Sequence, residues 1–287
     1  MDSKTWVELN NGVKMPLLGL GVFRSQAGEE TRSAVRTALE YGYRMIDTAR
    51  IYCNERSVGR GLKDSMVPRS EIFVTTKLWK DDFGDARRGL EQSLERLGLD
   101  YVDLFLLHWP FKGFEQAYLV LEQLQQEGLC RAIGVSNFKS HHIEELRAAG
   151  ASVMPQVNQV ECHPQNSEDE LLNFCRQRNI VVEAYSPLGG EGRTLISDPR
   201  ITSLADYLKV TPAQVILRWN IQRGVVVIPK SIHTERIKEN SHVFEFELSQ
   251  DDMDTISSIN ANLRRAYDSD RIDQRPASTF PKIVEEP

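Results

Sequence analysis

The chain has 287 residues, of which 40% are hydrophobic and 26% charged, and its formal net charge is −6. This composition is typical of a globular protein with a large core, and the charge offers no basic surface for nucleic acid or anionic lipid. No apolar run approaches the ~18 residues of a membrane span, and the N-terminal residues lack the apolar core of a signal peptide. We therefore expect a cytoplasmic protein without a membrane or nucleic-acid partner.

The first element predicted along the chain is a β-hairpin. Apolar runs over 6–9 and 13–16 flank Asn10-Asn11-Gly12. Asn-Gly between two such runs is a strong signal for a tight hairpin turn. We expect residues 1–17 to form a small cap on one end of the domain.

Short apolar strands then alternate with longer helical segments. The predicted strands are Leu18–Gly21, Met45–Asp47, Phe73–Lys77, Val102–His108, Ala132–Ser136, Pro155–Val160, Val181–Tyr185 and Val225–Pro229. Apolar residues at three- and four-residue spacing predict helices that include Glu29–Tyr41, Ala86–Leu97, Glu115–Glu127, Ser140–Ala149 and Glu168–Arg178. Capping residues mark two more helix starts, at Thr211 and Ser249. Eight βα units predict an α/β fold, with a parallel sheet closed into a (β/α)₈ TIM barrel.

Two other architectures fit the length less well. Two separate domains would need a linker, and no Pro/Ser/Gly linker occurs before the C-terminal tail. A doubly wound sheet usually carries G-x-G-x-x-G after its first strand, but Gly19–Arg24 breaks that pattern at its last position, and Gly59-Arg60-Gly61 follows no strand. We therefore expect one domain over residues 1–287.

The four cysteines give no sign of a disulfide framework or a metal site. Cys53, Cys130, Cys162 and Cys175 are scattered, so we expect free thiols. Cys162-His163 lacks further ligands at suitable spacing. His141 and His142 open a predicted helix, and we expect both on the surface.

Titratable side chains cluster at the predicted strand ends, where barrels of this kind place their active sites. Asp47, Lys77 and His108 end the second, third and fourth strands, and Tyr52 follows Asp47 by five residues. A lone His or Tyr at a strand end is usually structural. Four such groups on one rim favour an active site.

Each of the four groups can take one role in a single reaction. A phenol has a reference pKa of about 10, and a neighbouring ammonium lowers it. Tyr52 could therefore donate a proton, with Lys77 adjusting its pKa and Asp47 holding Lys77 charged. His108 could orient the substrate oxygen. This set suits the protonation of a carbonyl oxygen that receives a hydride, whereas a hydrolase would use paired carboxylates, a nucleophile or a metal.

Ordered motifs along nearly the whole chain resemble those of the aldo-keto reductases. These motifs are Gly42–Ala49, Tyr52–Glu55, Thr76–Trp79, Leu107–Pro110, Gly134–Phe138, Asn158–Glu161, Tyr185–Gly189 and Ile228–Ser231. The compact loops are similar to microbial and protozoan members of the diketogluconate reductase and prostaglandin F synthase type. The resemblance implies a (β/α)₈ barrel, commonly monomeric, that reduces aldehydes and ketones with NADPH. It places the family's catalytic tetrad on Asp47, Tyr52, Lys77 and His108.

The resemblance also implies an NADPH site. Ser136, Asn137 and Gln159 would bind the nicotinamide carboxamide, and Tyr185 would stack on its ring. Lys230, Ser231 and Arg236 would hold the 2′-phosphate, and Glu239 and Asn240 would contact the adenine. The remaining implied contacts are Gly21, Val22, Phe23, Asp47, Ser186, Pro187, Leu188 and Ile232. The glycine-rich stretch Leu188–Arg200 would fold over the pyrophosphate.

The substrate pocket is less well specified. The implied pocket residues are Phe23, Tyr52, Trp79, His108, Trp109 and Phe111. Many family members carry Trp where this chain has Phe23. The loop Phe111–Gly113 is short, which predicts a pocket that is open on that side. The first part of the tail, Leu263–Arg275, should line the pocket, and we expect disorder in the last dozen residues.

Two alternatives to a reductase remain at this point. A non-catalytic relative could bind NADPH as a nucleotide-sensing subunit, although the intact tetrad argues against that role. An unrelated barrel hydrolase could share the rim by convergence. Such a hydrolase would have no use for the 2′-phosphate residues in Lys230–Asn240.

Overall fold

The structure is a computed structural model that describes residues 5–190, 194–284 and 286. Eight parallel strands form one sheet in chain order, from β3 to β10. Parallel bridges from Leu18 to Val227 and from Gly21 to Lys230 join the last strand back to the first. The strands are β3 (Leu20–Gly21), β4 (Met45–Asp47), β5 (Phe73–Leu78), β6 (Val102–Leu107), β7 (Cys130–Ser136), β8 (Val157–Glu161), β9 (Val181–Tyr185) and β10 (Val226–Val227).

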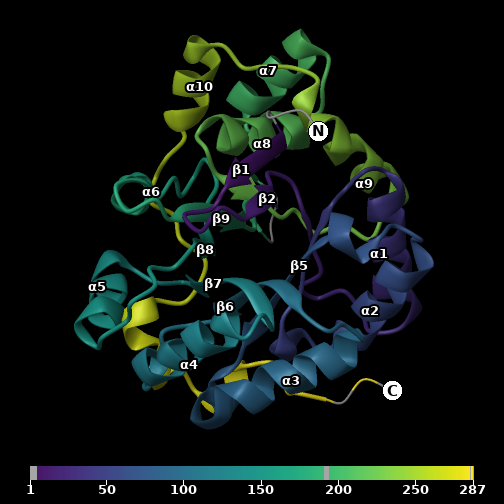
Figure 1. Ribbon diagram of the computed structural model, residues 1–287. Coiled ribbons are helices and arrows are strands. Elements are labelled where there is room, and N and C mark those ends of the chain that lie inside the picture. Colours follow the sequence, from purple (N-terminus) through teal and green to yellow (C-terminus); the bar gives the residue numbers. More distant parts are fainter. Residues whose placement is uncertain (1–4, 191–193, 285, 287) are drawn as a thin grey trace.

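Helices surround these strands on all sides, which confirms the predicted (β/α)₈ barrel (Figure 1). They are α1 (Glu29–Glu40), α2 (Glu55–Asp64), α3 (Ala86–Leu97), α4 (Phe114–Gln126), α5 (Ser140–Ala148), α6 (Asp169–Arg176), α7 (Pro199–Leu208), α8 (Pro212–Gln222), α9 (Thr234–Ser241) and α10 (Gln250–Ser257). A short 3₁₀ helix, η2 (Arg50–Tyr52), follows β4. None of the helices in the described ranges combines the length and the apolar character that a bilayer crossing requires.

Capping and close packing explain several of these helices. Thr211 Oγ1 accepts a hydrogen bond from the Gln214 backbone N–H, and Gln214 Oε1 accepts one from the Thr211 backbone N–H, as in a capping box. In α2, a Cβ at Gly59 would lie 2.1 Å from the Leu97 carbonyl oxygen. The glycines of Gly59-Arg60-Gly61 therefore allow α2 to pack tightly between its neighbours.

The predicted hairpin is present and closes the amino-terminal end of the barrel. β1 (Trp6–Glu8) and β2 (Lys14–Pro16) pair antiparallel. Leu9 and Met15 are buried against Met45, Phe73 and Leu104 in the apolar filling of the barrel. The hairpin therefore lies at the end opposite the strand termini that carry the predicted catalytic residues.

The described part of the C-terminal tail packs against the barrel, which corrects the expected disorder there, while residues 285 and 287 lie outside the described residues. It contains the 3₁₀ helix η6 (Ser269–Gln274), followed by Phe280, whose ring lies 5.4 Å from that of Trp79 and 5.8 Å from that of Phe111. Glu286 accepts a hydrogen bond from the Arg56 backbone N–H at the start of α2. Aromatic contacts and a helix-capping carboxylate thus anchor a segment whose sequence shows no period.

Candidate active site

The structure brings the four predicted catalytic side chains together at the carboxyl-terminal end of the barrel. Asp47 ends β4, Tyr52 ends η2, Lys77 is the second-to-last residue of β5, and His108 follows β6. The Lys77 ammonium donates to Asp47 Oδ1 at 2.6 Å, to the Thr48 carbonyl oxygen at 2.9 Å and to Tyr52 Oη at 3.3 Å. Lys77 therefore connects the carboxylate to the phenol through one nitrogen.

Burial controls the protonation states of this cluster. It raises the pKa of Tyr52 to about 12, against the opposite pull of the Lys77 ammonium. Burial is the largest influence on Lys77 and lowers its pKa, but the attraction of Asp47, with further contributions from Tyr52 and Glu183, outweighs burial, so the net shift is upward. Tyr52 therefore remains a protonated donor at neutral pH. The sequence indicated only the lowering effect of Lys77, because burial is a tertiary property.

His108 is neutral and lies beside the phenol. Burial, with a further contribution from the Lys77 charge, lowers the pKa of His108 well below its ordinary value. Its ring centroid lies 5.6 Å from that of Tyr52 and 5.4 Å from that of Trp79. His108 Nδ1 is buried without a hydrogen-bond partner among the described residues. A neutral imidazole can donate one hydrogen bond to a substrate oxygen without adding charge.

The residues expected to hold the nicotinamide carboxamide form a network next to this cluster. Tyr185 Oη donates to Asn137 Oδ1 at 2.7 Å, and Asn137 Nδ2 donates to Ser136 Oγ at 3.1 Å. Asn137 has φ 65°, a left-handed conformation that Asn tolerates better than most residues. Gln159 Nε2 donates to Asp47 Oδ2 at 2.8 Å. The carboxamide residues and the catalytic cluster thus share Asp47.

Two acidic residues of this region, Glu183 and Glu161, were not predicted from the sequence. Glu183 accepts from Gln159 Nε2 at 2.7 Å and lies opposite it in the β8–β9 register. Glu161, at the end of β8, accepts from the backbone N–H groups of Arg265 and Ala266 and so anchors the start of the tail. Both could have been recognised from the sequence, because each is an acidic residue inside or at the end of an otherwise apolar strand.

Lys230, Ser231 and Arg236 gather around the start of α9. Lys230 and Arg236 are exposed, and neither has an ion pair within the described chain. Ser231 Oγ accepts from the His233 backbone N–H at 3.1 Å. The N-terminus of a helix with two cations beside it favours a phosphate. Asn240 Oδ1 is buried without a partner among the described residues, so it can accept a hydrogen bond from a ligand amine.

The other implied cofactor contacts differ in exposure. Gly21 and Val22 are buried, and a Cβ at Gly21 would lie 2.8 Å from the Ile228 carbonyl oxygen, so barrel closure itself requires glycine there. Ser186 is exposed, Pro187 is buried, and Leu188 and Ile232 are half-buried. Glu239 is bound to the Thr211 hydroxyl at 2.6 Å. Part of the expected pyrophosphate loop, residues 191–193, lies outside the described residues.

The prediction of an open pocket beside Phe111 is wrong. Trp79, Trp109 and Phe111 are buried in one cluster with Ile272 and Phe280 of the tail. The tail therefore covers the side that the short loop exposes. Of the predicted pocket residues, only Phe23 is exposed, at 44%. Its ring centroid lies 5.0 Å from that of Tyr52.

The expectation that both histidines of α5 lie on the surface is half wrong. His141 is exposed, but His142 is buried, and its Nδ1 accepts a hydrogen bond from the Lys139 backbone N–H. This bond caps the start of α5, so packing and capping account for His142.

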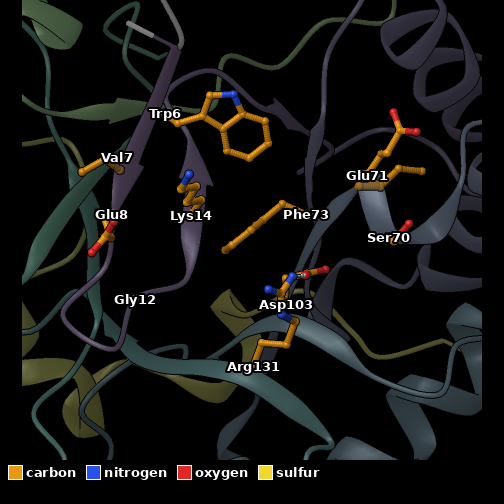
Figure 2. A pocket seen from close by; sticks show the side chains of 11 residues that line it. Trp6, Val7, Glu8, Gly12, Lys14, Ser70, Glu71, Phe73, Asp103 and Arg131 are labelled. Carbon is orange, nitrogen blue, oxygen red and sulfur yellow. Dashed lines mark hydrogen bonds and ion pairs between the residues drawn. The ribbon is translucent and has the colours of Figure 1, made fainter. Parts of the chain in front are cut away.

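A cavity of about 650 Å³ lies at the opposite end of the barrel (Figure 2). Figure 2 shows Trp6 and Lys14 of the hairpin, with Phe73 beside Lys14 and with Asp103 and Arg131 below them. Asp103 accepts hydrogen bonds from Arg131 at 3.0 Å and from the Val74 backbone N–H at 2.9 Å, and it forms an ion pair with Arg69 at 2.8 Å. Its carboxylate is thus fully bonded within the protein, which indicates a structural role.

Comparison with known proteins identifies relatives over nearly the whole chain. The model of the Aldo/keto reductase family matches residues 17–261. A glyoxal reductase of Bacillus subtilis is 48% identical over 272 residues, covering 94% of this chain and 98% of its own. A 9,11-endoperoxide prostaglandin H2 reductase of Trypanosoma cruzi is 48% identical over 268 residues, covering 92% and 94%. A solved aldo-keto reductase of Bombyx mori, in complex with NADP, is 36% identical with a TM-score of 0.87, covering 93% and 96%.

Proposed function

The chain belongs to the aldo/keto reductase family, and from that premise we propose that it reduces aldehydes and ketones with NADPH, with Tyr52 as the proton donor. The observation that carries the proposal is the buried ammonium of Lys77, which bonds both Asp47 and the Tyr52 hydroxyl. A phenol held against a cation, with a neutral imidazole beside it, suits proton delivery to a carbonyl oxygen.

The residues present fit a dinucleotide with a 2′-phosphate. Lys230 and Arg236 offer two exposed cations beside the start of α9, and Asn240 offers a free buried acceptor at the adenine end. Ser136, Asn137 and Gln159 offer the donors and acceptors that a carboxamide needs. When bound, NADPH would supply the hydride.

The protein's own groups would manage the proton and the substrate oxygen. His108 would donate a hydrogen bond to the carbonyl oxygen and fix it near Tyr52. As negative charge develops on that oxygen, Tyr52 would release its proton to it. Lys77, held by Asp47, would stabilise the resulting phenolate electrostatically. In the reverse direction, Tyr52 would take the proton back.

The substrate class is a small or medium-sized carbonyl compound. The two relatives that are 48% identical act, by their names, on glyoxal and on a prostaglandin endoperoxide, so overall identity does not separate these chemistries. The aromatic rings of Phe23 beside Tyr52 and of Trp79 beside His108 favour an apolar or planar substituent next to the carbonyl. The cytoplasmic location, the monomeric state and the single domain stay predictions.

The proposal is tested by following NADPH consumption with a panel of aldehydes, α-dicarbonyls, keto-sugars and a prostaglandin endoperoxide. We expect turnover of at least one class. NADPH binding without turnover of any class would instead support the nucleotide-sensing alternative. Absence of both binding and turnover would overturn the proposal.

A further inference from the structure

Two buried carboxyl groups share a single buried cation beside the active site. Glu183 is fully buried, and Asp47 is 2% exposed. Lys77 bonds Asp47 directly, while Glu183 is reached only through the Gln159 amide. If both carboxyl groups were ionised, this buried cluster would carry an uncompensated negative charge, which is energetically unfavourable away from water.

The bonding decides which carboxyl group keeps a proton. Asp47 receives the Lys77 ammonium and one Gln159 N–H, whereas Glu183 receives only the other N–H. Glu183 Oε1 has no partner among the described residues. The carboxyl group whose anion is better stabilised, Asp47, loses its proton at the lower pH, and the less well bonded Glu183 keeps its proton. Burial, with the charge of Asp47, raises the pKa of Glu183 to about 8.

The same bonds fix the Gln159 side chain. Both of its N–H groups face carboxyl oxygens, at 2.8 Å and 2.7 Å. An amide flip would turn its carbonyl oxygen toward those acceptors, which is unfavourable. The only side-chain atom that Gln159 can offer to a bound carboxamide is therefore its acceptor, Oε1.

We infer that Glu183 is a positioning residue that holds a proton at neutral pH, fixes the Gln159 amide and makes the preference between oxidised and reduced nicotinamide depend on pH. The inference rests on the proposed function, because it assigns Gln159 to the nicotinamide. The ionisable groups that interact with Glu183 are Asp47 from β4, Lys77 from β5 and Tyr52 from η2. Once Glu183 ionises, its negative charge favours the cationic nicotinamide of NADP⁺ over neutral NADPH.

The first measurement uses the protein without nucleotide. The pKa of Glu183 is raised on folding, so the folded state binds this proton more tightly than the unfolded state does. Its contribution to stability is present at low pH and is lost as the pH rises through about 8. The unfolding temperature of the wild type should therefore fall relative to that of Glu183→Gln between pH 6.5 and pH 9. Parallel curves would show that Glu183 does not hold the proton.

The second measurement is binding of NADP⁺ and NADPH, followed by quenching of protein fluorescence at pH 6.5 and pH 9. In the wild type, the affinity ratio should move toward NADP⁺ by at least about fivefold at the higher pH. Glu183→Gln should hold a constant ratio. Glu183→Leu, which removes the acceptor for Gln159, should bind both nucleotides more weakly than Glu183→Gln does.

The outcomes separate the two proposals. If the wild type binds neither nucleotide, the proposed function fails, while the unfolding curves still decide whether Glu183 holds the proton. If the wild type binds both and its affinity ratio does not change with pH, the positioning role of Glu183 is contradicted and the proposed function stands. An equal change in wild type and Glu183→Gln would assign the pH dependence to another group and would also contradict the inference.

Discussion

The two ends of the barrel each bury a carboxylate beside basic side chains, but the basic partners differ in their exposure to solvent. At the amino-terminal end, the Asp103 side chain is 1% exposed, while its partners Arg69 and Arg131 are 24% and 47% exposed. At the carboxyl-terminal end, Asp47 and Lys77 are 2% and 0% exposed. The first ion pairs keep contact with water, and the second is sealed from it.

The difference extends to the neighbouring polar atoms. The Asp103 carboxylate is fully bonded and ties β5, β6 and β7 together. Arg69 Nε beside Asp103 is also buried without a partner in the described chain, but around Asp47 the unpartnered atoms, His108 Nδ1 and Glu183 Oε1, belong to an imidazole and a carboxyl group near the Lys77 ammonium. Buried polar groups are normally satisfied, and exceptions concentrate at functional sites. One end therefore contributes to stability, and the other keeps reactive groups available at a cost in stability.

The largest effect is expected from Lys77→Met. Removing one partner of a buried pair leaves the other charge uncompensated, which costs about 3–5 kcal/mol of unfolding free energy. Turnover should also be lost. The double variant Asp47→Asn/Lys77→Met should recover stability in denaturant titrations but not turnover. Recovery of both would show that the pair has only a structural role.

Arg236→Ala should change ligand binding at the carboxyl-terminal end without changing the fold. Loss of charge-assisted bonds to the 2′-phosphate should weaken NADPH binding by about 1.5–3 kcal/mol, and NADH binding much less. Titration calorimetry measures both. Lys238→Ala, at an exposed position of the same helix, is the control. Equal losses for NADPH and NADH would reject the phosphate assignment.

Asp103→Asn should give the smallest effect. It removes the charge that holds Arg69 and Arg131 while keeping the shape, so about 1–3 kcal/mol of unfolding free energy should be lost. The value of kcat should not change. Asp100→Asn, at an exposed position nearby, should stay within about 0.5 kcal/mol of the wild type. A loss of kcat in Asp103→Asn would contradict the claim that the amino-terminal end contributes to stability and not to catalysis.

The position of the catalytic cluster at the carboxyl-terminal end was predictable from the sequence, because a barrel brings the ends of its parallel strands together. Asp47, Lys77 and His108 each lie at the end of an apolar strand, so their common location on one rim could be inferred from the sequence alone. The closed pocket wall was not predictable, since Phe280 lies in a tail without periodicity and packs there only by tertiary contact. The net pKa shift of Tyr52 was missed for the same reason, because it depends on burial.

The most direct test of the account is the turnover and the unfolding free energy of Tyr52→Phe, measured beside Asp103→Asn. Removing the phenol hydroxyl should lower kcat by about 10²–10⁴-fold while NADPH binding and stability persist. Asp103→Asn should give the reverse, with reduced stability and unchanged kcat. Full activity in Tyr52→Phe, or parallel losses of activity and stability in both variants, would contradict the assignment of chemistry to one end and stability to the other.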